Sequence, residues 1–292
     1  MKRKWISGLL ILVLVFSLPL GALAADGTMV YTALGDSIAW GTGAAEDMGY
    51  TRLLHEHLER SRGEVEFNLM AEDGVTSEML LYALSAPGDP EGAQAAVAGA
   101  DLVTISIGGN DLLGPFNDAV SGLLWTHYFN GTYLAVGQML WDLSQWEMNP
   151  ASQPHITAMF QGLAGTLALQ SEAFEGKWQA IIGAVRMLNP GAQVLVTTVF
   201  NPFDFSVRLY EMADPLLYGL NGPIWALADP YGYQVADVYG AFSGYGNPRK
   251  PLVGGIELLP GFMLDPDSWP VPLHPTDRGY RMILNLHKDL LN

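Results

Sequence analysis

Ser37, within Ala33-Leu34-Gly35-Asp36-Ser37, is the residue whose surroundings best suit a chemical role. It follows an apolar, strand-like run that begins at Met29, and it precedes the turn-forming Gly41-Thr42-Gly43. A serine at the carboxyl end of a first strand can present its hydroxyl at a site while the sheet holds its backbone still. Because Gly-Asp-Ser is also a common turn sequence, a catalytic serine depends on what accompanies it further along the chain.

Three other sequences at the ends of expected strands carry residues suited to the same site. They are Glu72-Asp73-Gly74-Val75-Thr76-Ser77, Gly108-Gly109-Asn110-Asp111 and Leu273-His274-Pro275-Thr276-Asp277. A serine hydroxyl is too weakly acidic to attack an ester without a base, and an imidazole can take and return a proton near neutral pH. Taken singly, Gly74 reads as a turn glycine, Asn110 as a helix cap and His274 as a surface histidine. Their order along the chain favours catalysis.

The four blocks together resemble the signature of the GDSL-type esterase/lipase family, also called SGNH hydrolases. The resemblance covers nearly the whole chain after its N-terminal segment. It implies an ester hydrolase that forms an acyl-enzyme, with Ser37 as the nucleophile and His274 as the base. It also implies an oxyanion hole made by the backbone N–H groups of Ser37 and Gly74 and the side-chain amide of Asn110. Such a reaction needs water and no metal or cofactor, and no acidic loop has the spacing of a calcium site.

The sequence departs from this pattern at one position. The family usually places an aspartate three residues before the histidine, where it orients the imidazole, and here that position is Val271. Valine cannot accept a hydrogen bond from the ring. We therefore expect Asp267 to take this role because the prolines between it and His274 could fold it back, with Asp265 or a backbone carbonyl as the alternatives.

The elements that must position these residues alternate between short apolar strands and helices. Strands are expected at 29–34, 65–69, 102–107, 193–199 and 233–238, and helices at 50–60, 76–84, 171–188, 207–227 and 279–290, the fourth interrupted near Asn221-Gly222-Pro223. This alternation predicts right-handed crossovers and a parallel sheet. The resemblance implies a three-layer α/β/α sandwich with a five-stranded parallel sheet of flavodoxin-like type.

The segment from about 115 to 170 interrupts this alternation and predicts a helical insertion after the third strand. It is rich in aromatic residues: Trp125, Tyr128, Phe129, Tyr133, Trp141 and Trp146. One interpretation is a helical cap that forms an apolar acyl or aryl pocket over the site. The other is a helical pair with an ordinary buried core, and one segment could do both.

The N-terminus has the features of a secretory signal peptide. Lys2-Arg3-Lys4 precede an apolar run, and Ala22-Leu23-Ala24 supply a small-x-small cleavage site. We expect residues 1–24 to be removed, leaving one hydrolase domain at 25–292 in a secreted protein without stable membrane insertion; a retained anchor is the alternative.

Composition excludes several binding partners and several kinds of site. Cleavage would remove three of the 14 basic residues and none of the 30 acidic ones, so the remaining chain would carry a formal charge of −19. Such a surface repels nucleic acids and anionic membranes. The absence of cysteine excludes disulfides, a thiolate zinc site and a cysteine nucleophile, and His55-Glu56-His57 has diverging side chains that do not suit a metal pair.

The function that these features favour is a secreted serine esterase or lipase. Its substrates would be short- to medium-chain acyl esters, lysophospholipids or acylated sugars, and the aromatic insertion favours apolar acyl groups. One alternative is a carbohydrate O-acetylesterase. The other, motivated by Val271 at the usual aspartate position, is a catalytically silent surface binding module.

Overall fold

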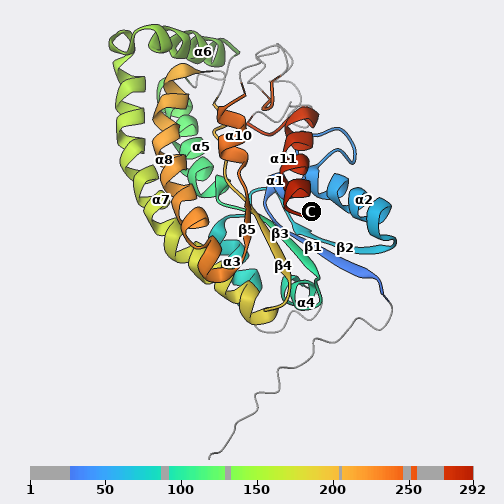
Figure 1. The fold of residues 1–292 in the computed structure, drawn as a ribbon. Coiled ribbons are helices and arrows are strands. Elements are labelled where there is room, and N and C mark those ends of the chain that lie inside the picture. The colour runs from blue at the N-terminus through green and yellow to red at the C-terminus, as the bar shows by residue number, and fades with distance from the viewer. Residues whose placement is uncertain are drawn as a thin grey trace, which may run out of the picture.

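A computed structural model describes residues 27–86, 92–128, 133–203, 206–245, 251–254 and 273–291 (Figure 1). Its centre is a five-stranded sheet in the order β2-β1-β3-β4-β5, in which every pairing is parallel. The strands are β1 (Met29–Gly35), β2 (Val65–Ala71), β3 (Leu102–Ser106), β4 (Gln193–Thr197) and β5 (Gln234–Ala236). The expected sheet is confirmed, and most of its expected strands are within two residues of those observed at both ends.

The register brings three strand ends together. Gly35, the last residue of β1, lies opposite Ala71 of β2 and Ser106 of β3. The strand order changes direction between β1 and β3, and sites in open parallel sheets form in the crevice beyond such a point. The segments that follow β1, β2 and β3 are therefore neighbours in space.

Helices cover both faces of the sheet (Figure 1). One face packs against α2 (Tyr50–Arg62) and α11 (Asp277–Leu290), and the other against α3 (Ser77–Ser85), α4 (Ala93–Ala98), α7 (Pro154–Leu188) and α8 (Val207–Ala226). Alternate strand residues supply the two cores. In β1, for example, Tyr31 and Ala33 belong to the cluster under α2, whereas Leu34 belongs to the cluster under α7. Short helices complete the chain: α1 (Ser37–Trp40), α9 (Ala228–Tyr231) and α10 (Val238–Ser243).

The segment after β3 is helical, as expected. It comprises α5 (Gly109–Leu123), a π-helical turn (Leu124–Tyr128), α6 (Tyr133–Met148), a 3₁₀ turn (Pro150–Ser152) and the N-terminal half of α7. The last of these helices begins at Pro154, not at Ser171 as the sequence suggested. A proline in the first helical turn explains the observed start, because its missing N–H has no partner there in any helix. No helix in the described ranges is long and apolar enough to cross a membrane.

The interruption expected near residue 221 is wrong, because α8 runs unbroken through this region. The side chain of Asn221 is fully buried and makes a pair of hydrogen bonds with Val199. Its Oδ1 accepts from the Val199 N–H and its Nδ2 donates to the Val199 carbonyl, both at 2.8 Å. An asparagine that looks like a helix breaker in sequence thus fastens α8 to the segment that follows β4.

Candidate active site

Ser37 stands at the start of α1, where a glycine lets β1 and β3 approach closely. Gly35 has a φ of +147°, and a Cβ placed on it would lie 2.1 Å from the carbonyl oxygen of Ser106. The N–H of Asp36 donates to the same carbonyl at 3.1 Å, and the Asp36 carboxylate caps α1 by accepting from the Ile38 N–H at 3.0 Å. The serine side chain is therefore held on a short, capped turn at the end of the strand.

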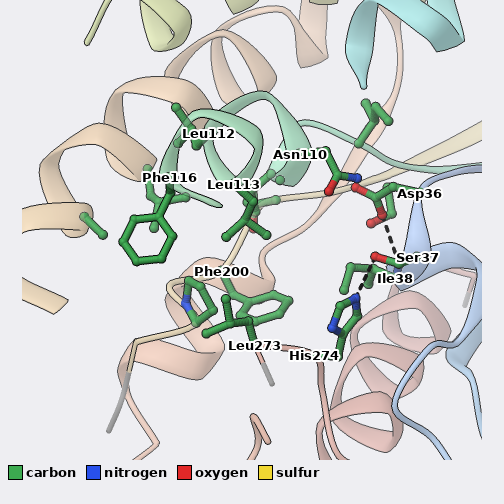
Figure 2. Close-up of a pocket in the computed structure, with 18 of the residues that line it drawn as sticks. Asp36, Ser37, Ile38, Asn110, Leu112, Leu113, Phe116, Phe200, Leu273 and His274 are labelled. Carbon is green, nitrogen blue, oxygen red and sulfur yellow. Dashed lines mark hydrogen bonds between the residues drawn. The ribbon is translucent and has the colours of Figure 1, made fainter. Parts of the chain in front are cut away.

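The predicted base lies beside the predicted nucleophile. His274 Nε2 is 2.8 Å from Ser37 Oγ, although the two residues come from opposite ends of the chain (Figure 2). Ser37 is only 7% exposed. This distance is within the range at which an imidazole takes a proton from a hydroxyl group.

Backbone pairing fixes the position of His274. The Gly254 N–H donates to the His274 carbonyl at 2.8 Å, and the Leu273 N–H donates to the Gly254 carbonyl at 3.1 Å. An isolated antiparallel bridge joins Val253 to Pro275. Leu273 has a φ of +74°, a left-handed conformation that a branched side chain seldom adopts and that is often found beside functional residues.

The segment after α1 also contacts the histidine segment. The Tyr280 hydroxyl donates to the Thr42 carbonyl at 2.7 Å, and the Asp277 carboxylate accepts from the Ala45 N–H at 2.9 Å. Both contacts hold the first turn of α11 against the residues that follow the nucleophile. The serine and histidine segments are therefore fastened to each other by contacts outside the reacting pair.

Asn110 lies in the first turn of α5, facing the segment after β2. Its Nδ2 donates to the Val75 carbonyl at 2.9 Å, and an amide group has a second N–H to offer. Asn110 and Ser37 both line the same cleft, and Figure 2 shows Asn110 beside Asp36 above the serine. Gly74 is not among the described residues that line this cleft. It directly precedes Val75, whose carbonyl binds Asn110, and it has a φ of +80°.

Asp111 binds the segment after β2 to the start of α5. Its buried carboxylate accepts from the Ser77 N–H at 2.9 Å and from the Ser77 hydroxyl at 2.5 Å. Lys177 of α7 contacts it at 3.3 Å. Charge-assisted bonds of this kind are short and strong, so the position of Asn110 relative to Gly74 and Val75 is fixed by its neighbour in the sequence.

The Ser37–His274 pair opens into an apolar cleft with a volume of about 790 Å³ when the solvent at its mouth is included. Near the serine the wall is polar, with Asp36 and Asn110 (Figure 2). Away from it the wall is made by apolar side chains from α5, α7, α8 and the segment after β4: Leu112, Leu113, Phe116, Leu167, Phe200, Pro202, Phe203, Ala213, Leu216 and Leu217. Nothing local in the sequence marks these wall residues, because only the fold brings the four segments together.

Asp36 has an unusual electrostatic environment. Its pKa is raised to about 7, mainly by burial and to a smaller extent by the nearby carboxylates of Asp111 and Asp73, while the hydrogen bond from the Ile38 N–H opposes the shift. A carboxyl group that is 3% exposed and adjacent to the nucleophile therefore keeps its proton to a higher pH than an exposed aspartate does. Apart from its place in the Gly-Asp-Ser sequence, no pattern in the sequence marks Asp36 as functional.

Some predicted residues lie outside the described part of the chain. They are Asp265, Asp267 and Val271, together with the segment 1–24, so the group that orients His274 stays a prediction. Among the described residues, no cluster of three or more histidine, aspartate or glutamate side chains could hold a metal ion. His55 of the His-Glu-His sequence stacks on Phe67, with ring centroids 4.8 Å apart.

The aromatic residues of the insertion form a core of their own. Tyr128 and Trp146 are buried in a cluster with Phe160, separate from the cores on the sheet. Trp125 and Trp141 are 65% and 62% exposed. Phe129 lies outside the described residues, as does the side chain of Tyr133. The insertion still contributes to the cleft, but through Phe116 and Leu167, at its two ends.

Comparison with known proteins gives one family and several structures of the same fold. The model of the GDSL-like Lipase/Acylhydrolase family matches residues 33–282. A lipase from a goat rumen metagenome is 20% identical with a TM-score of 0.59, and the match covers 90% of this chain and 97% of that one. An extracellular lipase from Streptomyces rimosus is 19% identical with a TM-score of 0.56, covering 90% and 99%.

An acetyl xylan esterase is 18% identical with a TM-score of 0.52, covering 90% of this chain and 100% of that one. No curated protein matches the sequence. At these identities, the likeness to the solved structures establishes the fold and leaves the substrate open.

Proposed function

The chain belongs to the GDSL-like lipase/acylhydrolase family, and from this premise we propose that it is a secreted serine esterase that cleaves esters with apolar acyl groups. Membership of the family implies an ester hydrolase. The mechanism, the acyl preference and the export are our proposals, and each has its own test.

The observation that carries the mechanism is the hydrogen bond between His274 Nε2 and Ser37 Oγ at the mouth of an apolar cleft. Nucleophile and base within hydrogen-bond reach are the signature of an activated serine. In the first step the serine oxygen attacks the ester carbonyl carbon while the imidazole takes the serine proton. The bond to the alcohol then breaks, and the imidazolium returns that proton to the departing oxygen.

Hydrolysis of the acyl-enzyme repeats these steps with water as the nucleophile. The carbonyl oxygen is negatively charged in each tetrahedral intermediate, and we assign its stabilisation to the Ser37 and Gly74 N–H groups and the Asn110 amide. The β2-β1-β3 order supports this assignment because the three donors follow adjacent strands. Loss of one such donor typically lowers the rate by about 10²–10³.

Kinetics with p-nitrophenyl butyrate test the roles of the two residues. We expect Ser37→Ala and His274→Ala each to lower kcat by several orders of magnitude, with melting temperatures close to that of the wild type. A Ser37→Ala protein with full activity would exclude the serine as the nucleophile. An inactive wild type would favour the silent binding module.

The orienting group is tested by replacing Asp265 and Asp267 separately with alanine. Loss of the orienting aspartate in a well-studied triad lowers the rate by about 10⁴, and we expect a loss of that order at Asp267. Full activity of both variants would instead assign the orientation of His274 to a backbone carbonyl or to a serine-histidine dyad without an acid.

The acyl preference is tested by comparing octanoate release from a p-nitrophenyl ester with acetate release from acetylated xylan. The apolar cleft wall supports octanoate as the better substrate. Faster release of acetate would make the protein a carbohydrate O-acetylesterase, the activity named for one structure of the same fold.

Export is tested by expressing the full chain in a bacterial host and sequencing the N-terminus of the protein outside the cells. We expect the mature chain to begin at Ala25. A protein that stays in the membrane with Met1 intact would show that the N-terminal segment is an anchor.

A further inference from the structure

A second apolar compartment adjoins the cleft over Ser37, on the side away from His274. It lies between α5, α7 and α8, and its volume is about 480 Å³ when the solvent at its opening is included. The two spaces share a wall of five side chains, Phe116, Leu167, Phe203, Ala213 and Leu216. Because the same residues line both, these shared side chains separate the compartment from the cleft.

The lining of the second compartment is entirely apolar. Beyond the shared wall it comprises Phe160, Leu163, Ala164, Leu209 and Met212. A space whose side chains offer no hydrogen-bonding groups binds water poorly, so it favours an apolar occupant. The ligand portion that fits this chemistry is a hydrocarbon chain.

Two aromatic rings stand between the compartments. The centroids of Phe116 and Phe203 lie 5.1 Å apart, and the rings are tilted by 51°. Phe116 also lies 6.4 Å from Phe160, which lines only the second compartment. Phe116 is partly exposed, whereas Phe203 is buried, so Phe116 is the ring with room to turn aside.

We propose that the second compartment binds the distal part of a long acyl chain, and that Phe116 sets the chain length at which this binding begins. The inference rests on the proposed esterase function, since the carbonyl end of the chain must lie at Ser37. A short acyl group occupies only the cleft. A longer one displaces the Phe116 ring and gains apolar contacts with α7 and α8.

Each methylene group that leaves water for such a compartment improves binding roughly fourfold. Along a series of p-nitrophenyl esters from butyrate to hexadecanoate, kcat/KM should therefore rise while the acyl chain fills the cleft. It should rise a second time once the chain is long enough to enter the second compartment. Phe116→Ala removes the partition, and we expect the second rise to start at a shorter chain.

Ala164→Phe offers the sharper test. Ala164 lines only the second compartment and is otherwise exposed, so a larger side chain there can fill the space without crowding the core. We expect this variant to lose the second rise, at least tenfold for hexadecanoate, and to keep wild-type activity on butyrate. Ala158→Phe, an exposed position of the same helix that lines neither space, is the matched control and should keep the wild-type profile.

Calorimetry separates this inference from the esterase proposal. Ser37→Ala protein should bind dodecanoate, and adding Ala164→Phe should weaken that binding at least tenfold. If the wild type is inactive but Ser37→Ala protein binds dodecanoate and Ala164→Phe weakens that binding, only the esterase proposal is refuted. Identical chain-length profiles for wild type and Ala164→Phe, with unchanged dodecanoate binding, would overturn the assignment of the second compartment.

Discussion

Gly43 is a position where one methyl group should disturb the reacting pair without disturbing the fold. It has a φ of +86°, and a Cβ placed on it would lie 2.9 Å from the Cβ of His274 and 3.4 Å from the carbonyl oxygen of Pro275. Carbon atoms in contact prefer a separation of roughly 3.5–4.0 Å, so Gly43→Ala must move the histidine by about 0.6–1.1 Å.

That displacement is large compared with the tolerance of the reaction. The His274 Nε2 to Ser37 Oγ distance is 2.8 Å, and an increase of this size would take it beyond hydrogen-bond range. A misplacement of about 1 Å at a reacting centre can lower a rate by about 10². We therefore expect kcat of Gly43→Ala on p-nitrophenyl butyrate to fall by about 10- to 100-fold.

Gly63 provides a control because it also has a positive φ and has no neighbour at the position of an added Cβ. Its φ is +94°, and nothing lies within 4 Å of an added Cβ. A positive φ is unfavourable for alanine at either position, so both variants should lose stability in a Tm measurement, and only Gly43→Ala should lose activity. Equal activity of the two variants would show that the packing around His274 does not govern catalysis.

Three other predictions concern single side chains. Asn110→Ala should lower kcat on p-nitrophenyl butyrate by about 10²–10³ with little change in KM; unchanged kcat would remove Asn110 from the oxyanion hole. The pKa of Asp36 is raised from 3.8 to about 7, so the folded state holds this proton more tightly and loses stability as pH rises from 4 to 7. Asp36→Asn lacks this loss, so its free energy of unfolding from urea curves should rise relative to that of the wild type by about 1.4 kcal/mol per pH unit over this interval, and parallel pH profiles for variant and wild type would refute it. Burial lowers the pKa of His287 from 6.5 to about 4, so its neutral form stabilises the fold above pH 6.5, and this stability is lost as pH falls toward 4. Relative to the wild type, His287→Gln should gain stability as pH falls from 6.5 toward 4 in the same assay, and a constant difference between the two proteins would count against this assignment.

The opposite signs of the last two effects have a consequence for the wild type. The contribution of Asp36 to the free energy of unfolding falls with rising pH, over nearly the same interval in which the contribution of His287 rises. The two slopes offset each other, so the wild-type free energy of unfolding should vary less between pH 4 and 7 than that of either variant.

Strand positions were predictable because they depend on local composition. The β-branched and apolar run of β4, between a turn and Asn201-Pro202, allows few other structures. Sites in parallel sheets form at the carboxyl ends of the strands. On this basis Ser37 and Asn110 could be placed at neighbouring strand ends without knowledge of any contact. The proximity of His274 came only through the family resemblance, since no local signal relates residues so far apart.

The parts that the sequence did not predict depend on tertiary contacts. Asn221 and Pro223 are helix breakers by propensity, but the two hydrogen bonds between Asn221 and Val199 and the packing of Leu220 and Ile224 keep α8 continuous. The cleft wall was missed for the same reason. Leu216 faces the cleft only because α8 lies beside α7, a relation that has no counterpart in the order of residues along the chain.

Labelling with a fluorophosphonate tests the nucleophile without the natural substrate, because the reagent bonds only to a serine whose proton a base removes. After digestion, mass spectrometry should find the adduct on the wild-type peptide that contains Ser37. Ser37→Ala should stay unlabelled, and His274→Ala should react far more slowly. An adduct on another serine, or none on a wild type that hydrolyses esters, would contradict the pairing of these two side chains as the reactive centre.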